Sequence, residues 1–248
     1  MDIPRIFTVS ESEHRIHNPF TPEKYATLGR VLRMKPGTRI LDLGSGSGEM
    51  LCTWARDHGI TGTGIDMSRL FTEQATRRAD ELGVSDHVRF IHDDAAGYVA
   101  DEKCDVAACV GATWIAGGVA GTMALLAKSL RPGGMILIGE PYWREVPASD
   151  EVAQACGVSS IADFLTLPDL VASFDAQGYD LVEMVLADQE GWDRYEAAKW
   201  MTLRRWLAEN PDDDFAQEVR AELIIAPKRH VTYTREYFGW GVFALIAR

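Results

Sequence analysis

The sequence predicts a doubly wound α/β fold in which helices cover both faces of a mostly parallel, seven-stranded sheet. From residue 39 to residue 140, short apolar runs alternate with helical segments, and strands joined through helices form parallel sheets with right-handed crossovers. A glycine-rich turn, GSGSG at 44–48, follows the first apolar run. Ligands of such sheets bind beyond the carboxyl ends of the strands. We therefore expect the functional site beside this turn.

The elements follow from local signals. Thr21 can cap a helix that begins at Pro22. The apolar stripe of that helix consists of Tyr25, Leu28 and Leu32. The next elements are predicted, in order, as a buried strand ending before Gly44, a helix closing on Gly59, a strand over 61–66, a helix over 69–82, a strand over 87–92, a short helix after Asp94, a strand over 104–110, a helix over 119–130, a turn over 131–134 and a strand over 135–140.

The last third departs from this alternation. One or two helices are predicted within 163–178, a strand over 179–187, a long helix over 191–210, a second helix over 215–224 and a closing strand over 241–248. A chain of 248 residues is long enough to build one large α/β domain.

Composition favours a small molecule as the substrate. The net charge of −12 and the isoelectric point near 4.9 disfavour nucleic acid and anionic membranes as partners, because affinity for phosphates depends largely on Lys and Arg. We expect a monomer or a homodimer. The first residues lack the apolar core of a secretory signal, which predicts a cytoplasmic location. The four cysteines include no CxxC pair, so we expect reduced core thiols and no metal site.

The glycine turn distinguishes between two ligand classes, dinucleotides and S-adenosylmethionine. The dinucleotide fingerprint is GxGxxG with a pyrophosphate at the helix N-terminus. Here the third glycine, Gly48, comes one residue early, and Glu49 occupies the position of the fingerprint glycine. A carboxylate about 4 Å from a phosphate charge would cost about 1 to 4 kcal/mol. The turn therefore disfavours a pyrophosphate.

Five segments carry a resemblance to a known family. They are ILDLGSGSG at 40–48, GIDMS at 64–68, FIHDDAAGY at 90–98, CDVAACVGATWI at 104–115 and LRPGGMILIGE at 130–140. In order and spacing they resemble the motifs of the class I S-adenosylmethionine-dependent methyltransferases. The resemblance covers residues 30–140 well and the tail loosely. It implies a Rossmann-like methyltransferase fold whose last two strands pair antiparallel at the sheet edge, and methyl transfer to a small molecule by in-line displacement.

The resemblance also implies a set of cofactor-binding residues for S-adenosylmethionine. Asp66 would hold the ribose hydroxyls, and its position 22 residues after Gly44 agrees with an acid that binds a sugar diol. An acid at a strand end is also typical of a helix cap. The backbone of Gly44, Ser45 and Gly46 would face the methionine portion, Asp94 and Ala95 would bind the adenine, and Met67 and Val110 would sandwich its ring.

Domain organisation is expected to follow the same family. We predict one methyltransferase domain, 1–248, in which 1–35 forms an N-terminal cover and first helix. Residues 143–230 are expected to form helical elaborations around the acceptor pocket.

Methyl transfer needs alignment and desolvation, and a base only for a protonated acceptor. His17 lies in the segment HRIHNPF, which resembles the N-terminal cover of related enzymes; together with His14 and Asn18 it could close over the donor, or it could simply be exposed. The further candidates are Glu140 and Tyr142, at the end of the fifth strand, Trp114, past the fourth, and Trp200, in the long helix. Each could equally serve packing alone.

The long helix presents a wide aromatic face. At 100° per residue, one arc of about 140° contains Trp192, Tyr195, Trp200, Leu203, Trp206 and Leu207 together with Glu196 and Lys199. Two charges on a core face would be costly unless they paired. Either this face borders the acceptor pocket, or the helix is a wide amphipathic one with a surface salt bridge.

Two other functions share these features. A NAD-dependent oxidoreductase would use the same fold, although the third fingerprint glycine is missing. A non-catalytic module that binds S-adenosylmethionine would have the donor site without an enclosed acceptor cavity.

Overall fold

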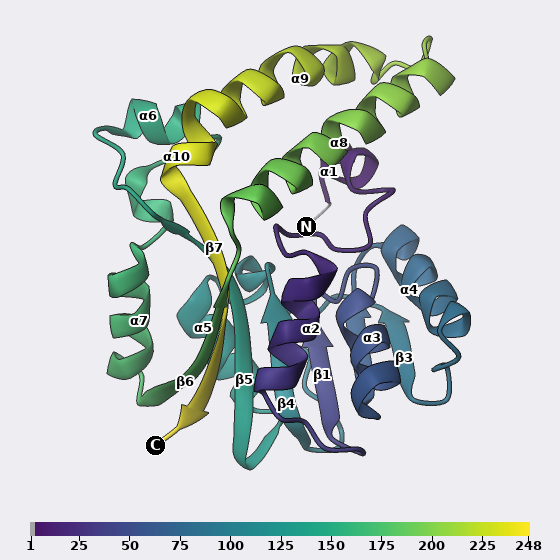
Figure 1. Ribbon diagram of the computed structural model, residues 1–248, viewed down its shortest axis with the longest axis vertical. Helices are drawn as coiled ribbons and strands as arrows, with labels where there is room; N and C mark the ends of the chain where they lie inside the picture. The colour runs from purple at the N-terminus through teal and green to yellow at the C-terminus, as the bar shows by residue number, and fades with distance from the viewer. Residues whose placement is uncertain (1–2) are drawn as a thin grey trace.

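The computed structural model describes residues 3–248 and contains one seven-stranded sheet in the order β3-β2-β1-β4-β5-β7-β6 (Figure 1). All pairs among β1 to β5 are parallel, and β7 runs antiparallel to both β5 and β6. This confirms the predicted fold class and the antiparallel edge. The strands are β1 Arg39–Leu43, β2 Thr61–Asp66, β3 Val88–His92, β4 Cys104–Val110, β5 Leu130–Trp143, β6 Tyr179–Leu186 and β7 Phe238–Ala247.

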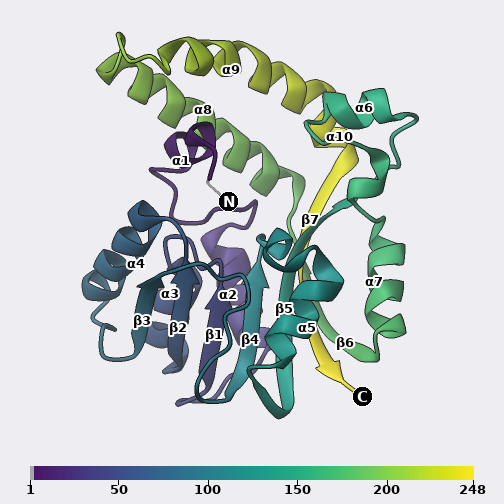
Figure 2. The same cartoon turned by 180° about the vertical axis from the view of Figure 1, so that it is seen from behind.

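Helices cover both faces of the sheet. One face carries α2 (Pro22–Val31), α3 (Glu49–His58) and α4 (Arg69–Glu81), and the other carries α5 (Val119–Ala127) and α7 (Leu167–Ala176), as the two opposite views show (Figures 1 and 2). Each layer buries its own apolar cluster against the strands. Burial of such apolar area is the main source of the fold's stability.

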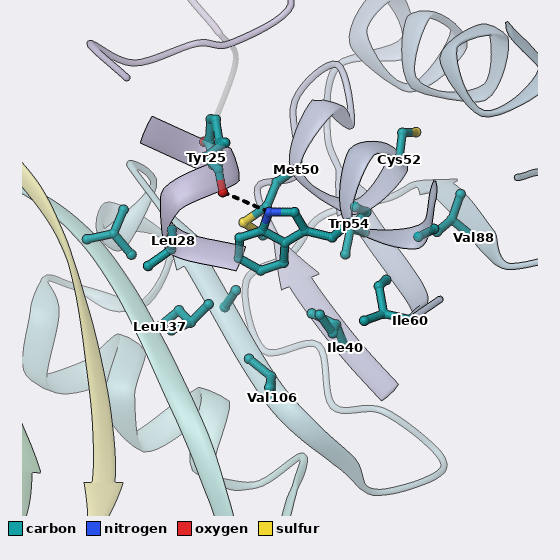
Figure 3. Packing of buried hydrophobic residues seen from close by; sticks show 14 of the residues in the cluster. Tyr25, Leu28, Ile40, Met50, Cys52, Trp54, Ile60, Val88, Val106 and Leu137 are labelled. Atoms are coloured by element: carbon teal, nitrogen blue, oxygen red, sulfur yellow. Dashed lines mark hydrogen bonds between the residues drawn. The ribbon is translucent and has the colours of Figure 1, made fainter. Parts of the chain in front are cut away.

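Trp54 lies at the centre of the first cluster (Figure 3). Its side chain is 1% exposed, and its indole Nε1 donates a hydrogen bond to the Tyr25 carbonyl at 3.1 Å. A buried indole N–H needs such a partner. This bond fixes α2 on α3. The start of α2 is also as predicted, because the Thr21 hydroxyl accepts a hydrogen bond from Lys24 N.

A third layer lies over the carboxyl ends of the parallel strands. It consists of α1 (Arg5–Ser10) and the helical hairpin of α8 (Gln189–Glu209) and α9 (Ala216–Arg229) (Figures 1 and 2). Val9, Leu203 and Val219 form its small core. Beside it, α6 (Asp150–Ala155) and the 3₁₀ turn Ile161–Asp163 pack around Trp143. This layer encloses the edge at which ligands of such sheets bind.

Three predicted elements between residues 94 and 134 were wrong in detail. No helix follows Asp94: the chain turns at Gly97, whose φ of +81° ends any helical continuation. The helix predicted over 119–130 ends at Ala127, because Leu130 already pairs with Cys104 in the sheet. The predicted turn over 131–134 is an irregularity within β5, where the register shifts between Cys104 and Val106.

The helix predicted over 215–224 extends to Arg229 and includes Pro227. It continues as a π-helical turn, His230–Thr234, and as α10 (Arg235–Tyr237) into β7. Tertiary contacts stabilise this extension: His230 is buried, and its Nε2 lies 2.8 Å from Asp193 Oδ1 of α8. Local sequence signals could not show this contact.

Candidate active site

A cavity of about 370 Å³ opens at the carboxyl ends of β1, β2 and β4. Seven of the eight predicted cofactor residues line it, namely Gly44, Gly46, Asp66, Met67, Asp94, Ala95 and Val110. Ser45 does not: its hydroxyl lies against Gly64, and the residue lines a smaller neighbouring cavity. We call the 370 Å³ space the first cavity.

The glycine turn brings bare backbone to this cavity. Gly44 and Gly46 have φ angles of +76° and +53°, which residues with a Cβ atom rarely adopt. Hydrogen bonds from the amides of Gly44 and Ser45 to the Ile65 carbonyl, at 2.8 and 3.1 Å, fix the turn on β2. A Cβ on Gly44 would lie 2.7 Å from the Ala112 side chain. Space and backbone conformation together therefore require glycine.

Asp66 ends β2 with its carboxylate buried at the cavity wall. One oxygen accepts from Gly46 N and the other from Ser68 N, both at 2.8 Å. Burial raises the pKa of Asp66, while these two N–H donors and the nearby histidines lower it in part. A carboxylate has about four acceptor positions, so two remain for further donors.

Asp94 and Ala95 lie at the end of the cavity beyond β3. One Asp94 oxygen accepts from Ala96 N at 2.8 Å, which fixes the carboxylate beside the cavity. Ala95 is buried, whereas Asp94 is exposed. This arrangement leaves the other Asp94 oxygen available to an amino group.

Asp42 is a buried acid without a full set of partners. It is 3% exposed, and its Oδ1 has no hydrogen-bond partner among the described residues. Burial, and then repulsion from Asp66, raise its pKa to about 7. It lines a small cavity of about 30 Å³ together with Gly44, Ser45 and Gly46. An orphaned buried carboxyl next to a glycine turn is suited to bind a cation.

Glu11 holds the N-terminal segment over the glycine turn. Its carboxylate is fully buried and receives three side chains: His14 Nδ1 at 2.6 Å, His17 Nδ1 at 3.2 Å and the Tyr195 hydroxyl at 2.6 Å. Burial alone would raise the pKa of Glu11, but the hydrogen bonds from the two histidines hold it at about 2. Glu11 is therefore a carboxylate at any working pH.

His17 carries this network onto the glycine turn. Its Nε2 lies 2.8 Å from the Ser47 hydroxyl, which donates to Gln74 Oε1 at 2.7 Å. The imidazole also packs on Phe71, with ring centroids 4.3 Å apart. The predicted cover residue His17 is thus clamped over the first cavity.

A second cavity, of about 530 Å³, lies between the strand ends and the α8–α9 hairpin. It shares Phe7, His17 and Gly111 with the first cavity, so the two spaces meet at these residues. Its wall includes the aromatic residues Phe164, Trp192, Tyr195, Phe238 and Trp240. Its polar groups include Asn18, Glu196, Lys199, Arg229 and His230.

The aromatic face of α8 divides between this cavity and the core. Trp192, Tyr195, Glu196 and Lys199 line the second cavity, and the two charges pair at 2.5 Å. Leu203, Trp206 and Leu207 instead pack in the small core of the third layer. The face therefore has two kinds of surroundings, a cavity along residues 192–199 and a packed core along residues 203–207.

The other candidate catalytic residues have different surroundings. Glu140 accepts a hydrogen bond from Thr113 at 2.7 Å and lines neither cavity, and its burial raises its pKa to about 7. Tyr142 belongs to the core on the α5–α7 face. Trp114 is 51% exposed at the rim of the first cavity. Trp200 lies behind the second cavity, edge-on to His230.

Sequence reasoning assigned no role to Glu11 or Ser47. Glu11 and Ser47 act through partners far along the chain: Glu11 and Tyr195 are 184 positions apart. Asp42 carries one available signal, since it is an acid in an otherwise apolar strand directly before the glycine turn. A charge in a buried strand is costly without a function.

Within residues 3–248, no group of three or more His, Cys, Asp or Glu side chains is arranged to hold a metal ion. None of the helices described there has the length and apolar character needed to cross a membrane.

Comparison with known proteins identifies the family. The family described as "Methyltransferase domain" matches residues 40–134. YjhP of Escherichia coli strain K12 is 84% identical, with both chains covered completely. A solved S-adenosylmethionine-dependent methyltransferase from Geobacter sulfurreducens, in complex with S-adenosylhomocysteine, is 72% identical at a TM-score of 0.98, covering 100% of this chain and 99% of that one.

A third relative agrees. The S-adenosylmethionine-dependent methyltransferase from Thiobacillus denitrificans, also solved in complex with S-adenosylhomocysteine, is 70% identical at a TM-score of 0.97 with complete coverage of both chains. Sequence identity at this level over whole chains confirms the resemblance inferred from the five motifs. This chain belongs to the S-adenosylmethionine-dependent methyltransferase family.

Proposed function

We propose that this enzyme binds S-adenosylmethionine in the first cavity and methylates a small-molecule acceptor in the second cavity. The observation that carries the proposal is the junction of the two spaces: Phe7, His17 and Gly111 line both. The donor supplies a methyl group on a sulfonium, already activated for displacement. The protein's main task is then to align two ligands and exclude water.

The residues around the first cavity fit this donor. Asp66 would accept from the ribose hydroxyls with its two remaining acceptor positions, and Asp94 would accept from the adenine amino group. The orphaned Asp42 carboxyl and the adjoining 30 Å³ cavity would take the methionine ammonium. Met67 and Val110 would flank the adenine, and Gly44, Ser45 and Gly46 would pass their backbone beside the methionine portion.

The second cavity defines the acceptor's shape. Its aromatic residues favour a molecule with a flat body, and its many polar side chains favour polar groups on that body. His17 is the candidate side chain at the junction, although both of its ring nitrogens already have partners. Because Glu140, Tyr142 and Trp200 line neither cavity, we propose that they pack behind the site and do not contact either ligand. A second cavity beside the proposed donor site favours an enzyme over a donor-binding module.

The domain organisation fits the same scheme. We propose one methyltransferase domain over residues 1–248, with the cover and first helix in 1–35 and the acceptor-pocket helices in 143–230. The net charge of −12 supports a small acceptor rather than a nucleic acid. Four buried thiols without disulfide bonds support a reducing, cytoplasmic location.

Two measurements test the function. Calorimetric titration should show that S-adenosylhomocysteine binds and that NAD does not. Incubation of the enzyme and S-adenosylmethionine with a metabolite library should then release S-adenosylhomocysteine with a planar acceptor that carries polar groups. Binding of NAD at the glycine turn, or failure to bind S-adenosylhomocysteine at millimolar concentration, would refute the proposal.

A further inference from the structure

We propose that Glu11 is a positioning residue that couples the acceptor wall to the donor cavity through Tyr195 and His17. The inference rests on the proposed function and adds a role for two residues that line different parts of the site. Tyr195 lines only the second cavity, whereas His17 lines both. Glu11 bonds both of them and lines neither cavity.

Each group around Glu11 has a defined role as donor or acceptor. Glu11 is 0% exposed and is held as a carboxylate, so it can only accept hydrogen bonds. Burial and the adjacent carboxylate raise the pKa of the Tyr195 phenol, so Tyr195 remains protonated and donates. Hydrogen bonds to a buried charge are short and strong. Removal of any donor leaves part of this buried charge uncompensated.

The network joins four parts of the fold. Tyr195 belongs to α8, Glu11 and His17 belong to the segment after α1, and Ser47 belongs to the glycine turn. Gln74 of α4 links the glycine turn back to the segment after α1, because its side chain accepts a hydrogen bond from Ser47 and donates one to the Ser12 carbonyl at 2.7 Å. A shift of α8 when the acceptor cavity fills would therefore move Glu11, and with it the imidazole above the glycine turn.

The segment is anchored to the hairpin on its other side as well. Arg205 of α8 pairs with Glu13 at 2.9 Å, and Arg5 of α1 pairs with Asp213 at 2.8 Å. These pairs are exposed and each contributes little to stability. The buried Glu11 bonds are the contacts through which α8 determines the position of His17.

The decisive variant is Tyr195→Phe, which removes one hydroxyl and keeps the ring. S-Adenosylhomocysteine should bind this variant about fivefold more weakly or worse, although Tyr195 does not line the first cavity. Hydrogen exchange in residues 11–18 of the free enzyme should accelerate. Tyr179→Phe, which removes a phenol hydroxyl on the edge strand β6, is the matched control and should leave both measurements unchanged.

A double-mutant cycle separates coupling from general destabilisation. In a His17→Ala background the path is already broken, so Tyr195→Phe should cause no further loss of S-adenosylhomocysteine affinity. Equal losses in both backgrounds, or wild-type affinity in Tyr195→Phe, would overturn the coupling. Absence of binding to the wild-type enzyme would instead refute the proposed donor site. Tyr195→Phe is conservative, so the test does not depend on folding of a Glu11 variant.

Discussion

His17 lies directly on the backbone of Gly46: a Cβ built on that glycine would lie 2.6 Å from His17 Cδ2. The N-terminal segment and the glycine turn thus fit together without room for one methyl group. Gly46 also has a φ of +53°. The same residue therefore meets two requirements, for backbone conformation and for closure of the donor site.

Gly46→Ala should separate these two requirements. We expect at least a tenfold loss of S-adenosylhomocysteine affinity, because the imidazole must move, and a loss of about 1 to 2 kcal/mol in the free energy of unfolding from the left-handed backbone. Calorimetry and chemical denaturation measure the two effects. Gly83→Ala is the control: its φ is +66° but no atom lies within 4 Å of the new Cβ. That variant should lose stability alone, and a loss of affinity there would contradict the explanation.

Asp66→Ala should abolish tight donor binding. The change removes the proposed ribose acceptor and leaves Gly46 N and Ser68 N without their partner. Loss of a charged hydrogen-bond partner costs about 1.5 to 3 kcal/mol per bond, so we expect a loss of affinity of about 100-fold or more. Titration with S-adenosylhomocysteine measures it, with the exposed Asp86→Asn as a control. An unchanged dissociation constant would remove Asp66 from the donor site.

Donor affinity should increase with pH because of Asp42. Burial and the neighbouring Asp66 raise the pKa of Asp42 to about 7, and an ammonium group binds only the ionised carboxylate. S-Adenosylhomocysteine affinity should therefore rise by up to about tenfold per pH unit from pH 5 to pH 7 and then level off. Asp42→Asn should bind more weakly and with a flatter pH profile. If the profile of this variant kept the wild-type slope, another group would be responsible.

Stability should show the opposite dependence at Glu140. Burial raises the pKa of Glu140 to about 7 from its ordinary value of 4.5. The folded state therefore holds this proton more tightly than the unfolded state, and the free energy of unfolding should fall between about pH 4.5 and pH 7, by about 1 to 3 kcal/mol. Denaturation curves at several pH values measure it. Glu140→Gln should flatten this slope and the exposed Glu145→Gln should not; equal slopes for both would contradict the prediction.

Two tryptophans of α8 should differ in their effect on turnover. Trp192 lines the second cavity, whereas Trp200 lies behind it against His230. With an acceptor found by the library screen, Trp192→Ala should lower kcat/KM about 10- to 100-fold while leaving S-adenosylhomocysteine affinity intact. Trp200→Phe, which keeps an aromatic ring, should retain most of the turnover. The reverse ranking would place the acceptor elsewhere.

The sequence by itself determined the sheet, the crossovers and the donor turn. The evidence for these elements is local: the alternation of strand and helix periods, the cap at Thr21 and the glycines at 44–48 each depend on residues that are close in sequence. The order of Gly44, Asp66 and Asp94 along the chain, together with the resemblance to the methyltransferase family, predicted that they meet at one edge of the sheet.

Only the tertiary structure decided how the site is closed. The tail helices, the path of α9 through Pro227 and the choice between core and cavity for each tryptophan of α8 depend on which surfaces meet. Glu11 shows the limit most clearly, because its partner Tyr195 is 184 positions away and no periodicity links the two. Local patterns fix dihedral angles and faces, but contacts between distant segments exist only once the topology brings them together.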